Sequence, residues 1–381
     1  MIYLDNAATT QPKPAPVKKA VLTALERYSA NPGRSGHPLS QNAAVSVFSA
    51  RRKVAQFFGS KPENVVFTSN CTHALNYVIK GVLHQGDHAI ISSLEHNAVA
   101  RPIYKLQQEN KITYDVAPVI PGNAEAVTRA FEGLMRPETR LVICTHASNV
   151  TGEIMPIEKI AKICKEKGIL FAVDAAQTAG VLEIDMQCGI DFLCVAPHKG
   201  LYAPMGTGIL IANVSVNDTI IEGGTGSYSN SLEQPLDMPE RLESGTVNVP
   251  GIVGLSAGID FVRNIGVENI YGHEMKLVQQ FYDGASKING IKLYSQRPEA
   301  GKTVPVVSFN VVGKNSMETA AILSDNGICV RGGLHCAPLA HTTLGTMDIG
   351  TVRICPSVFT NERDISAILR ILRTKIVEKI T

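Results

Sequence analysis

Two polar residues follow successive apolar segments of the chain, and their types suit one kind of chemistry. Asp174 ends the segment Leu170–Val173, and Lys199 follows Phe192–Val195 after a short turn. A carboxylate at the end of a buried strand can keep the ring nitrogen of a pyridine cofactor protonated. An amine at the end of the neighbouring strand can form a Schiff base with that cofactor's aldehyde. The pair therefore indicates a site for pyridoxal phosphate, although Asp174 alone also suits a turn cap and Lys199 alone a solvated loop charge.

Further residues offer what such a cofactor needs. The segment Ser69–Thr72 lies between an apolar run and a helical pattern, and backbone N–H groups at a helix N-terminus bind phosphate. An ordinary helix cap is the alternative for this segment. His198 suits the phosphate, Gln177 suits the phenolic oxygen, and His96 suits stacking and proton transfer above the ring. For His96 the alternative is a satisfied polar residue at a strand end.

One cysteine differs from the others in its surroundings. Cys336 lies in a glycine-rich loop with Arg331 and His335 close by, whereas several of the other cysteines lie inside apolar patterns. Nearby cationic groups favour a reactive thiolate, and an inert loop cysteine is the alternative. Arg353 interrupts an apolar strand pattern, which a carboxylate bound in a bidentate manner would explain as well as a structural ion pair.

Composition restricts the classes of partner. The 381 residues are 44% hydrophobic and 18% charged, with a net charge of +2 and no block of like charges. These values favour a small-molecule substrate and predict neither a nucleic-acid surface nor a membrane patch. Without a leader-like N-terminus or a long apolar run, the sequence predicts a cytoplasmic protein. The eight cysteines show no Cys-x-x-Cys pair or zinc-like spacing, so reduced thiols and no metal site are expected.

The elements that must position these residues alternate between strand and helix. Short apolar runs predict strands at Val65–Thr68, Ala89–Ser92, Leu141–Cys144, Leu170–Val173, Phe192–Val195 and Gly206–Ile211. Helical spacing predicts helices at Val17–Tyr28, Gln41–Phe58, Thr72–Gly81, Ala98–Glu109 and Ile157–Lys167. This alternation is typical of an α/β fold with a mostly parallel sheet covered on both faces, whose ligand crevice lies at the strand C-termini.

The last third of the chain has a different pattern. A glycine-, serine- and proline-rich stretch, Gly223–Pro239, predicts a long loop, and a helical segment follows from Pro250 to about Phe261. Strands at Val304–Asn310, Ile328–Arg331 and Val352–Cys355, with helices at Met317–Asn326 and from Asn361, then predict a smaller α+β unit. We therefore expect an N-terminal arm (1–15), a large cofactor-binding domain (16–255) and a small C-terminal domain (256–381) that carries Cys336.

The residues above resemble a known family, the class V aminotransferase-like pyridoxal-phosphate enzymes of fold type I. Within it the chain is most similar to the cysteine desulfurases and selenocysteine lyases, in the branch with a short Arg-x-Gly-x-His-Cys loop. The resemblance runs nearly end to end and depends on seven segments: Tyr3–Thr10, Glu95–Asn97, Ser148–Gly152, Val173–Gln177, His198–Lys199, Glu243–Thr246 and Arg331–Ala337.

The resemblance implies a role for each candidate residue. Lys199 would bind the cofactor covalently, Asp174 would pair with the ring nitrogen, Gln177 would contact the phenolic oxygen and His96 would stack on the ring. The phosphate would be held by Cys71, Thr72, His198 and, from the other subunit of a homodimer, Thr246. The substrate carboxylate would be bound by Asn149 and Arg353, and the nucleophile would be Cys336.

The activity that follows is conversion of L-cysteine to L-alanine, with transfer of the sulfur to Cys336 as a persulfide and then to an acceptor protein. L-selenocysteine is the alternative substrate, because a selenocysteine lyase uses much the same residues. A class V transaminase or β-eliminase and a non-catalytic cofactor scaffold are further alternatives. Two departures leave substrate choice open: the additional residue Gly200 after the lysine, and Asn70-Cys71 in place of a Gly-Thr type sequence.

Overall fold

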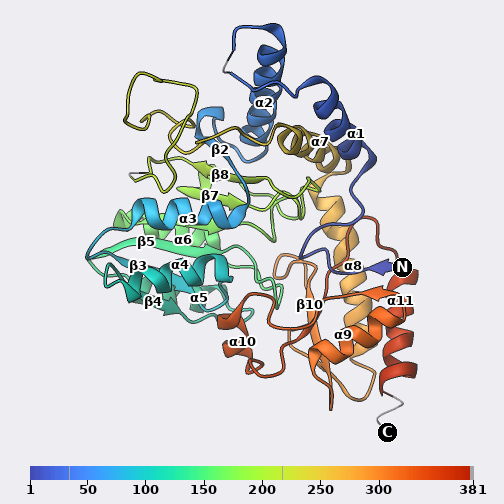
Figure 1. The fold of residues 1–381 in the computed structure, drawn as a ribbon. Helices are drawn as coiled ribbons and strands as arrows, with labels where there is room; N and C mark the ends of the chain where they lie inside the picture. The colour runs from blue at the N-terminus through green and yellow to red at the C-terminus, as the bar shows by residue number, and fades with distance from the viewer. Residues whose placement is uncertain (34, 217, 378–381) are drawn as a thin grey trace.

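The computed structural model describes residues 1–33, 35–216 and 218–377, and a seven-stranded sheet forms its centre (Figure 1). The strand order is β2-β8-β7-β6-β5-β3-β4, in which β8 runs antiparallel to both of its neighbours and the other pairs are parallel. The strands are β2 (Val65–Thr68), β3 (His88–Ser92), β4 (Thr113–Ala117), β5 (Thr139–Thr145), β6 (Leu170–Asp174), β7 (Phe192–Val195) and β8 (Gly208–Ala212). The mostly parallel sheet predicted from the sequence is confirmed.

The central strands are buried on both faces, which explains why their sequences are continuous apolar runs. Every residue of β7 and β8 is buried. The edge strand β4 differs, because Thr113 and Val116 are exposed and only Ala117 is fully buried. Its sequence, Thr-Tyr-Asp-Val-Ala, therefore lacks an apolar run, and the sequence analysis did not find this strand.

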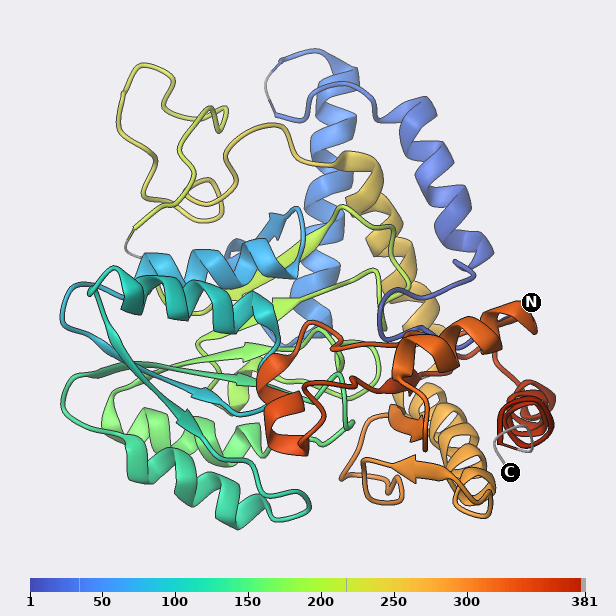
Figure 2. The same cartoon turned by 60° about the horizontal axis from the view of Figure 1, so that its bottom comes forward.

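Helices cover both faces of the sheet (Figure 2). On one face lie α3 (Cys71–Val82) and α4 (Asn97–Gln108), and on the other lie α5 (Ala124–Leu134) and α6 (Ile157–Lys167). The second face is extended by α2 (Pro38–Phe57) and α7 (Val249–Ile265), with α1 (Ala15–Arg27) packed on α7. Short 3-10 helices also occur at Pro62–Asn64 and Met186–Cys188. In the described residues, no helix is long and apolar enough to cross a membrane.

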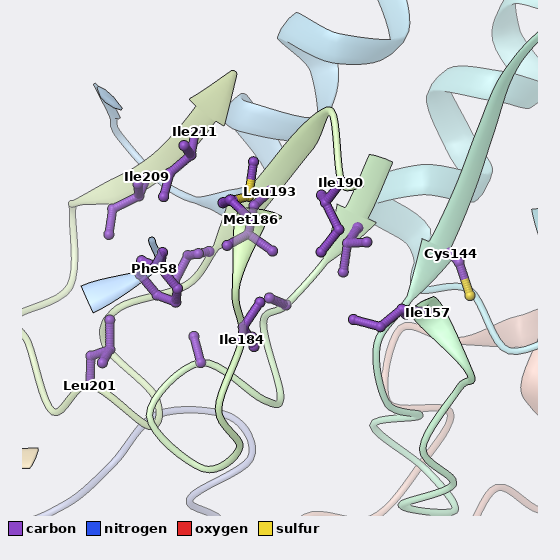
Figure 3. Close-up of a cluster of buried hydrophobic side chains, with 14 of the residues drawn as sticks. Phe58, Cys144, Ile157, Ile184, Met186, Ile190, Leu193, Leu201, Ile209 and Ile211 are labelled. Atoms are coloured by element: carbon purple, nitrogen blue, oxygen red, sulfur yellow. The ribbon is translucent and has the colours of Figure 1, made fainter. Parts of the chain in front are cut away.

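Large aliphatic and aromatic side chains fill the space under the sheet. Leu193 from β7 and Ile209 and Ile211 from β8 point into one cluster with Phe58 and Met186 (Figure 3). Leu201, from the turn after the lysine, lies in the same cluster. The segment that carries Lys199 therefore packs on the main core and is not an exposed surface loop.

A second core lies in the C-terminal part of the chain. Its elements are α8 (Val267–Ala285), β9 (Ile291–Leu293), β10 (Val307–Val311), α9 (Ser316–Asp325), β11 (Ile328–Cys329), α10 (Pro338–Leu344), β12 (Val352–Ile354), α11 (Glu362–Ile371) and a π-helix (Leu372–Val377). The strands β12, β10 and β9 form an antiparallel sheet, against which α8 and α11 pack. The sequence analysis ended its helical segment at about Phe261 and predicted no helix at the position of α8. In the structure α7 continues to Ile265, and Gly266, with φ of 92°, separates it from α8.

The helix α7 bears on where the two units meet. Its buried residues Val249, Leu255 and Val262 belong to the core of the large sheet. A boundary at residue 255 would cut this helix, so we propose that the large unit extends to Gly266. The smaller α+β unit would then begin with α8.

The N-terminal arm connects the two units. Its strand β1 (Ile2–Tyr3) pairs in parallel with β11, and Asn6 Nδ2 donates to Cys355 O at 2.9 Å. The arm then crosses to the sheet, where Thr10 N donates to His198 O at 3.1 Å. In Figure 1 it runs from beside α8 and α11 towards α1. The long loop predicted at Gly223–Pro239 contains no helix or strand.

Candidate active site

A cavity lies at the carboxyl ends of the parallel strands, where the large unit meets the smaller one. Nearly all residues selected from the sequence line it: Cys71, Thr72, His96, Asn149, Asp174, Gln177, His198, Lys199 and Arg353. Arg331 and His335 line it from the smaller unit, and Ala7 and Ala8 from the N-terminal arm. Cys336 is exposed beside this cavity, and Thr246 lines a different one.

Asp174 is the last residue of β6 and is only 4% exposed. Its Oδ1 accepts hydrogen bonds from Ala176 N at 2.9 Å and from Cys71 Sγ at 3.5 Å. These contacts fix the carboxylate at the base of the cavity. An acid group in this position suits a protonated ring nitrogen of a bound pyridine.

Lys199 follows β7 through a tight turn, in which its N–H donates to Ala196 O at 3.1 Å. Burial lowers the pKa of its amine below the ordinary value, and the charge of Asp174 opposes this shift only in part. A lysine with a depressed pKa is more often neutral and is therefore a better nucleophile and base.

The carbonyl oxygen of His198 is held by several donors from the N-terminal arm. It accepts hydrogen bonds from Thr10 N and Thr9 Oγ1, both at 3.1 Å, and from Lys13 Nζ at 2.7 Å. Burial lowers the pKa of Lys13 to about 8. The arm therefore fixes the peptide from which Lys199 projects, a role that the sequence analysis did not assign to these residues.

His96 is the N-cap of α4, and its Nδ1 accepts a hydrogen bond from Ala98 N at 3.0 Å. In the neutral ring this contact leaves the proton on Nε2. Burial lowers the pKa of His96 to about 4, and the charge of Lys199 adds to the shift while that of Asp174 opposes it. This shift favours the neutral ring near pH 7, and a neutral ring can stack on a flat cofactor.

The N-terminus of α3 provides a seat for an anion. Cys71 and Thr72 lie in its first turn, while the cap Asn70 accepts a hydrogen bond from His73 N at 2.8 Å. Among the described residues, His198 Nδ1 is buried without a hydrogen-bond partner. Free backbone donors and an unpaired imidazole nitrogen on one cavity fit a phosphate group.

The side-chain amide of Gln177 contacts the N-terminal arm, where its Nε2 donates to Ala7 O at 3.1 Å. Thr246 lies outside the cavity of its own chain, and Asn31 Nδ2 donates to its Oγ1 at 3.4 Å. This location is compatible with the prediction that Thr246 serves another subunit, which stays a prediction.

The guanidinium of Arg353 joins several parts of the site. The residue is 1% exposed, NH2 donates to Asp5 Oδ1 at 2.8 Å, and NH1 donates to Asn149 O at 3.0 Å. The side chain of Asn149 in turn donates through Nδ2 to His335 O at 2.8 Å. The two residues predicted to bind a carboxylate are thus adjacent, and Asn149 also holds the loop of Cys336.

The loop of Cys336 has an uncommon backbone conformation. His335 and Cys336 have φ angles of 49° and 57°, a backbone region that residues other than glycine rarely adopt. His335 Nε2 donates to Thr351 O at 2.8 Å, and Arg331 NH2 lies 3.5 Å from Cys336 Sγ. These anchors hold an exposed thiol beside a buried cavity.

The chain is similar to known proteins over almost its whole length. The aminotransferase class-V family matches residues 2–368, so the chain belongs to the class-V aminotransferase family. Probable cysteine desulfurases of Methanothermobacter thermautotrophicus and Pyrococcus abyssi are 34% and 33% identical to it. The alignments cover 96% and 98% of this chain and 92% and 93% of theirs.

Solved structures give the same result. A cysteine desulfurase of Thermococcus onnurineus superposes with a TM-score of 0.88 at 32% identity, over 99% of this chain and 95% of the other. The cysteine desulfurase CsdA of Escherichia coli has a TM-score of 0.86 at 26% identity, over 97% and 92% of the two chains. These similarities confirm the fold type I architecture expected from the sequence.

Proposed function

We propose that the protein is a pyridoxal-phosphate-dependent cysteine desulfurase that converts L-cysteine to L-alanine and receives the sulfur on Cys336. The observation that carries this proposal is the placement of an exposed thiol beside a buried cavity that contains Lys199 and Asp174. A lysine and carboxylate alone would suit many reactions of amino acids. The Cys336 thiol adds a nucleophile that can accept a sulfur atom from the substrate.

The residues around the cavity fit the cofactor. Asp174 would hold the ring nitrogen, Gln177 the phenolic oxygen and His96 one face of the ring. The phosphate would be held by Cys71, Thr72, His198 and Thr246 of a second copy. When bound, pyridoxal phosphate supplies an electron sink for the α-carbon of an amino acid.

Separate residues of the chain would then bind the substrate, accept its α-proton and attack its sulfur. Arg353 and Asn149 would bind the substrate carboxylate, and the depressed pKa of Lys199 would leave Nζ more often unprotonated and able to accept the α-proton. Cys336 Sγ attacks the substrate sulfur, so that one S–S bond forms and the substrate C–S bond breaks. A persulfide remains on Cys336, and the carbon product leaves as alanine after protonation.

We also propose a homodimer, a cytoplasmic location and transfer of the sulfur to an acceptor protein. Side chains of Phe48, Tyr228, Leu232 and Leu236 are exposed, and Phe48 lines the same hollow as Thr246. A second copy seated there would cover apolar surface and bring Thr246 to its cavity. All eight cysteines are free, as expected for a reducing compartment.

An assay of products tests the activity. The holoenzyme is supplied with L-cysteine, L-selenocysteine or L-cystine, with and without an added thiol, and alanine, sulfide and selenide are measured. The proposal predicts equal amounts of alanine and sulfide from L-cysteine in the presence of thiol. Release of pyruvate without alanine would instead identify a β-eliminase, and a much faster reaction with L-selenocysteine would identify a selenocysteine lyase.

A further inference from the structure

Arg353 is a fully buried cation that faces the active-site cavity and is paired with the N-terminal arm. Its NH2 lies 2.8 Å from Asp5 Oδ1, and among the described residues Asp5 is the one carboxylate within ion-pair distance. The Arg353 side chain is 1% exposed and that of Asp5 is 19% exposed. The pair therefore connects the beginning of the chain to β12 at the edge of the cavity.

One edge of the guanidinium remains free. NH1 and NH2 are engaged by Asn149 O and Asp5, whereas Nε is buried without a hydrogen-bond partner among the described residues. A buried N–H group without a partner costs free energy, and a guanidinium has the geometry to bind carboxylates. The free Nε marks the place where an acceptor is missing.

Asp5 is held by its own backbone contacts and not by the cavity. Ala8 N donates to Asp5 O at 3.0 Å, and Cys355 N donates to Leu4 O at 2.7 Å on the adjacent residue. Ala7 and Ala8 line the cavity, while the contact of Asp5 with the site runs through Arg353. The backbone of Asp5 is thus held by contacts that do not involve the guanidinium.

We propose that Asp5 is a positioning residue that sets the affinity of Arg353 for the substrate carboxylate. This inference rests on the proposed function, in which Arg353 binds that carboxylate. Asp5 holds the guanidinium by NH2 at the wall of the cavity, and its negative charge repels a second carboxylate on the same cation. Asp5 therefore orients the Arg353 guanidinium and lowers its affinity for the substrate carboxylate.

The weakening has a chemical consequence. The amino-acid substrate and the alanine product carry the same carboxylate, so a strong clamp would retain the product as firmly as the substrate. The resident charge of Asp5 limits both affinities equally, which is uniform binding and is expected to appear in KM. Lys199, Arg331 and Asp174 also line the cavity with charged side chains, and all three are unchanged in the Asp5 variants.

Ligand titration of the holoenzyme tests the proposal. L-alanine and L-alaninamide, which lacks the carboxylate, are titrated while the absorbance of the cofactor is followed, in the wild type, in Asp5→Asn and in Asp283→Asn. Asparagine keeps an oxygen for Arg353 NH2 and removes the charge. Asp283, which pairs with Arg297 on the surface, gives the matched loss of a carboxylate from an arginine pair away from the site.

Asp5→Asn should bind L-alanine about tenfold more tightly, with its affinity for L-alaninamide unchanged. Asp283→Asn should match the wild type for both ligands. Unchanged or weaker binding of L-alanine, or an equal change for both ligands, would overturn the role of Asp5. If Asp5→Asn does not retain the cofactor, the same two titrations on Asp5→Ser decide the question by the same criteria.

The wild type tests the underlying function separately. If Arg353 binds the carboxylate, L-alanine should bind far more tightly than L-alaninamide in the wild type. Equal affinities there would contradict the proposed clamp itself, whereas a wild-type preference without a response in Asp5→Asn would contradict only the inference about Asp5.

Discussion

The backbone N–H of Asn97, at the start of α4, donates to the carbonyl oxygen of Cys336 at 2.7 Å. Asn97 follows His96, which caps the same helix. The loop of the proposed nucleophile is thus attached to the helix that carries the proposed stacking residue, although the two belong to different units of the chain. The contact joins the backbone of the Cys336 loop to a helix whose cap, His96, lines the cavity.

Asn97→Pro tests this contact, because proline removes the N–H and is accepted at the first position of a helix. His96 has φ of −72° and ψ of 156°, which suits a residue before proline. The proline Cδ would also take the place of the hydrogen that points at Cys336 O and push the loop away, so kcat for alanine formation should fall by about tenfold or more. Steady-state rates with L-cysteine measure the effect.

The matched control is Asn97→Ala, which keeps the N–H and should retain the wild-type rate. The absorbance of the bound cofactor should be the same in both variants, since neither change removes a group that we assign to cofactor binding. Equal rates in Asn97→Pro and Asn97→Ala would show that the contact does not position Cys336.

The ion pair of Arg51 and Glu243 holds the segment that leads to Thr246. The two side chains form two hydrogen bonds of 2.7 Å, are 8% and 9% exposed, and Phe67 N also donates to Glu243 Oε1. Arg51→Met leaves the buried carboxylate without its cation and should lower the free energy of unfolding by about 3–5 kcal/mol. Chemical denaturation measures this loss.

The surface pair of Arg297 and Asp283 supplies the control, because it has the same two hydrogen bonds of 2.7 Å with side chains that are 54% and 45% exposed. Arg297→Met should leave the unfolding midpoint nearly unchanged, since water solvates the remaining charge. Similar losses in the two variants would contradict the argument from burial.

Two helical glycines should respond in opposite ways to alanine. A Cβ on Gly258 in α7 would lie 2.2 Å from Leu201 O, whereas a Cβ on Gly272 in α8 would meet nothing within 4 Å. Gly272→Ala should stabilise the protein by about 0.5–1 kcal/mol. Gly258→Ala should destabilise it by about 1–3 kcal/mol and should weaken cofactor retention by displacing the turn after Lys199. Thermal unfolding of both variants, with and without the cofactor, measures these effects. Stabilisation by Gly258→Ala would contradict the close packing of Gly258 against Leu201 O.

Glu274 predicts a pH dependence of stability. It is buried, and burial raises its pKa to about 8, while the Tyr202 hydroxyl opposes the shift. The folded state then keeps the proton that the unfolded state loses above about pH 4.5, so stability falls as the pH rises from there to about 8. Glu274→Gln removes this loss.

The measurement is the free energy of unfolding at pH 6 and pH 8 in both proteins. The wild type should lose about 2 kcal/mol more than Glu274→Gln between the two values, because one pKa unit corresponds to about 1.4 kcal/mol. All other titrating groups are common to both proteins and cancel. An identical pH dependence would mean that Glu274 is already ionised in the folded protein.

The sequence predicted those features of the site that depend on local pattern. Asp174 and Lys199 end buried strands, and a parallel sheet brings such ends to one edge, so their proximity followed from the strand pattern. Strands buried on both faces were found because they are continuous apolar runs. The edge strand β4, with exposed side chains, carried no such signal, and helix α8 was also not predicted.

The contacts that remained unpredicted are between residues far apart in the chain. Asp5 and Thr10 belong to a motif noted from the sequence, yet nothing in the motif indicates that they contact Arg353 and the carbonyl of His198. The positive φ angles of His335 and Cys336 also lack a sequence signal, because glycine is absent at both positions. They depend on anchors from Asn97, Asn149 and Thr351, which only the folded chain assembles.

The account depends most directly on Cys336 as the group that receives sulfur. The test is a single turnover of the holoenzyme with L-cysteine in the absence of added thiol, followed by mass spectrometry of its peptides. We predict one additional sulfur atom on the peptide of Cys336, one equivalent of alanine, and neither in Cys336→Ala. Alanine without sulfur on Cys336, or undiminished sulfide release by Cys336→Ala, would contradict the account.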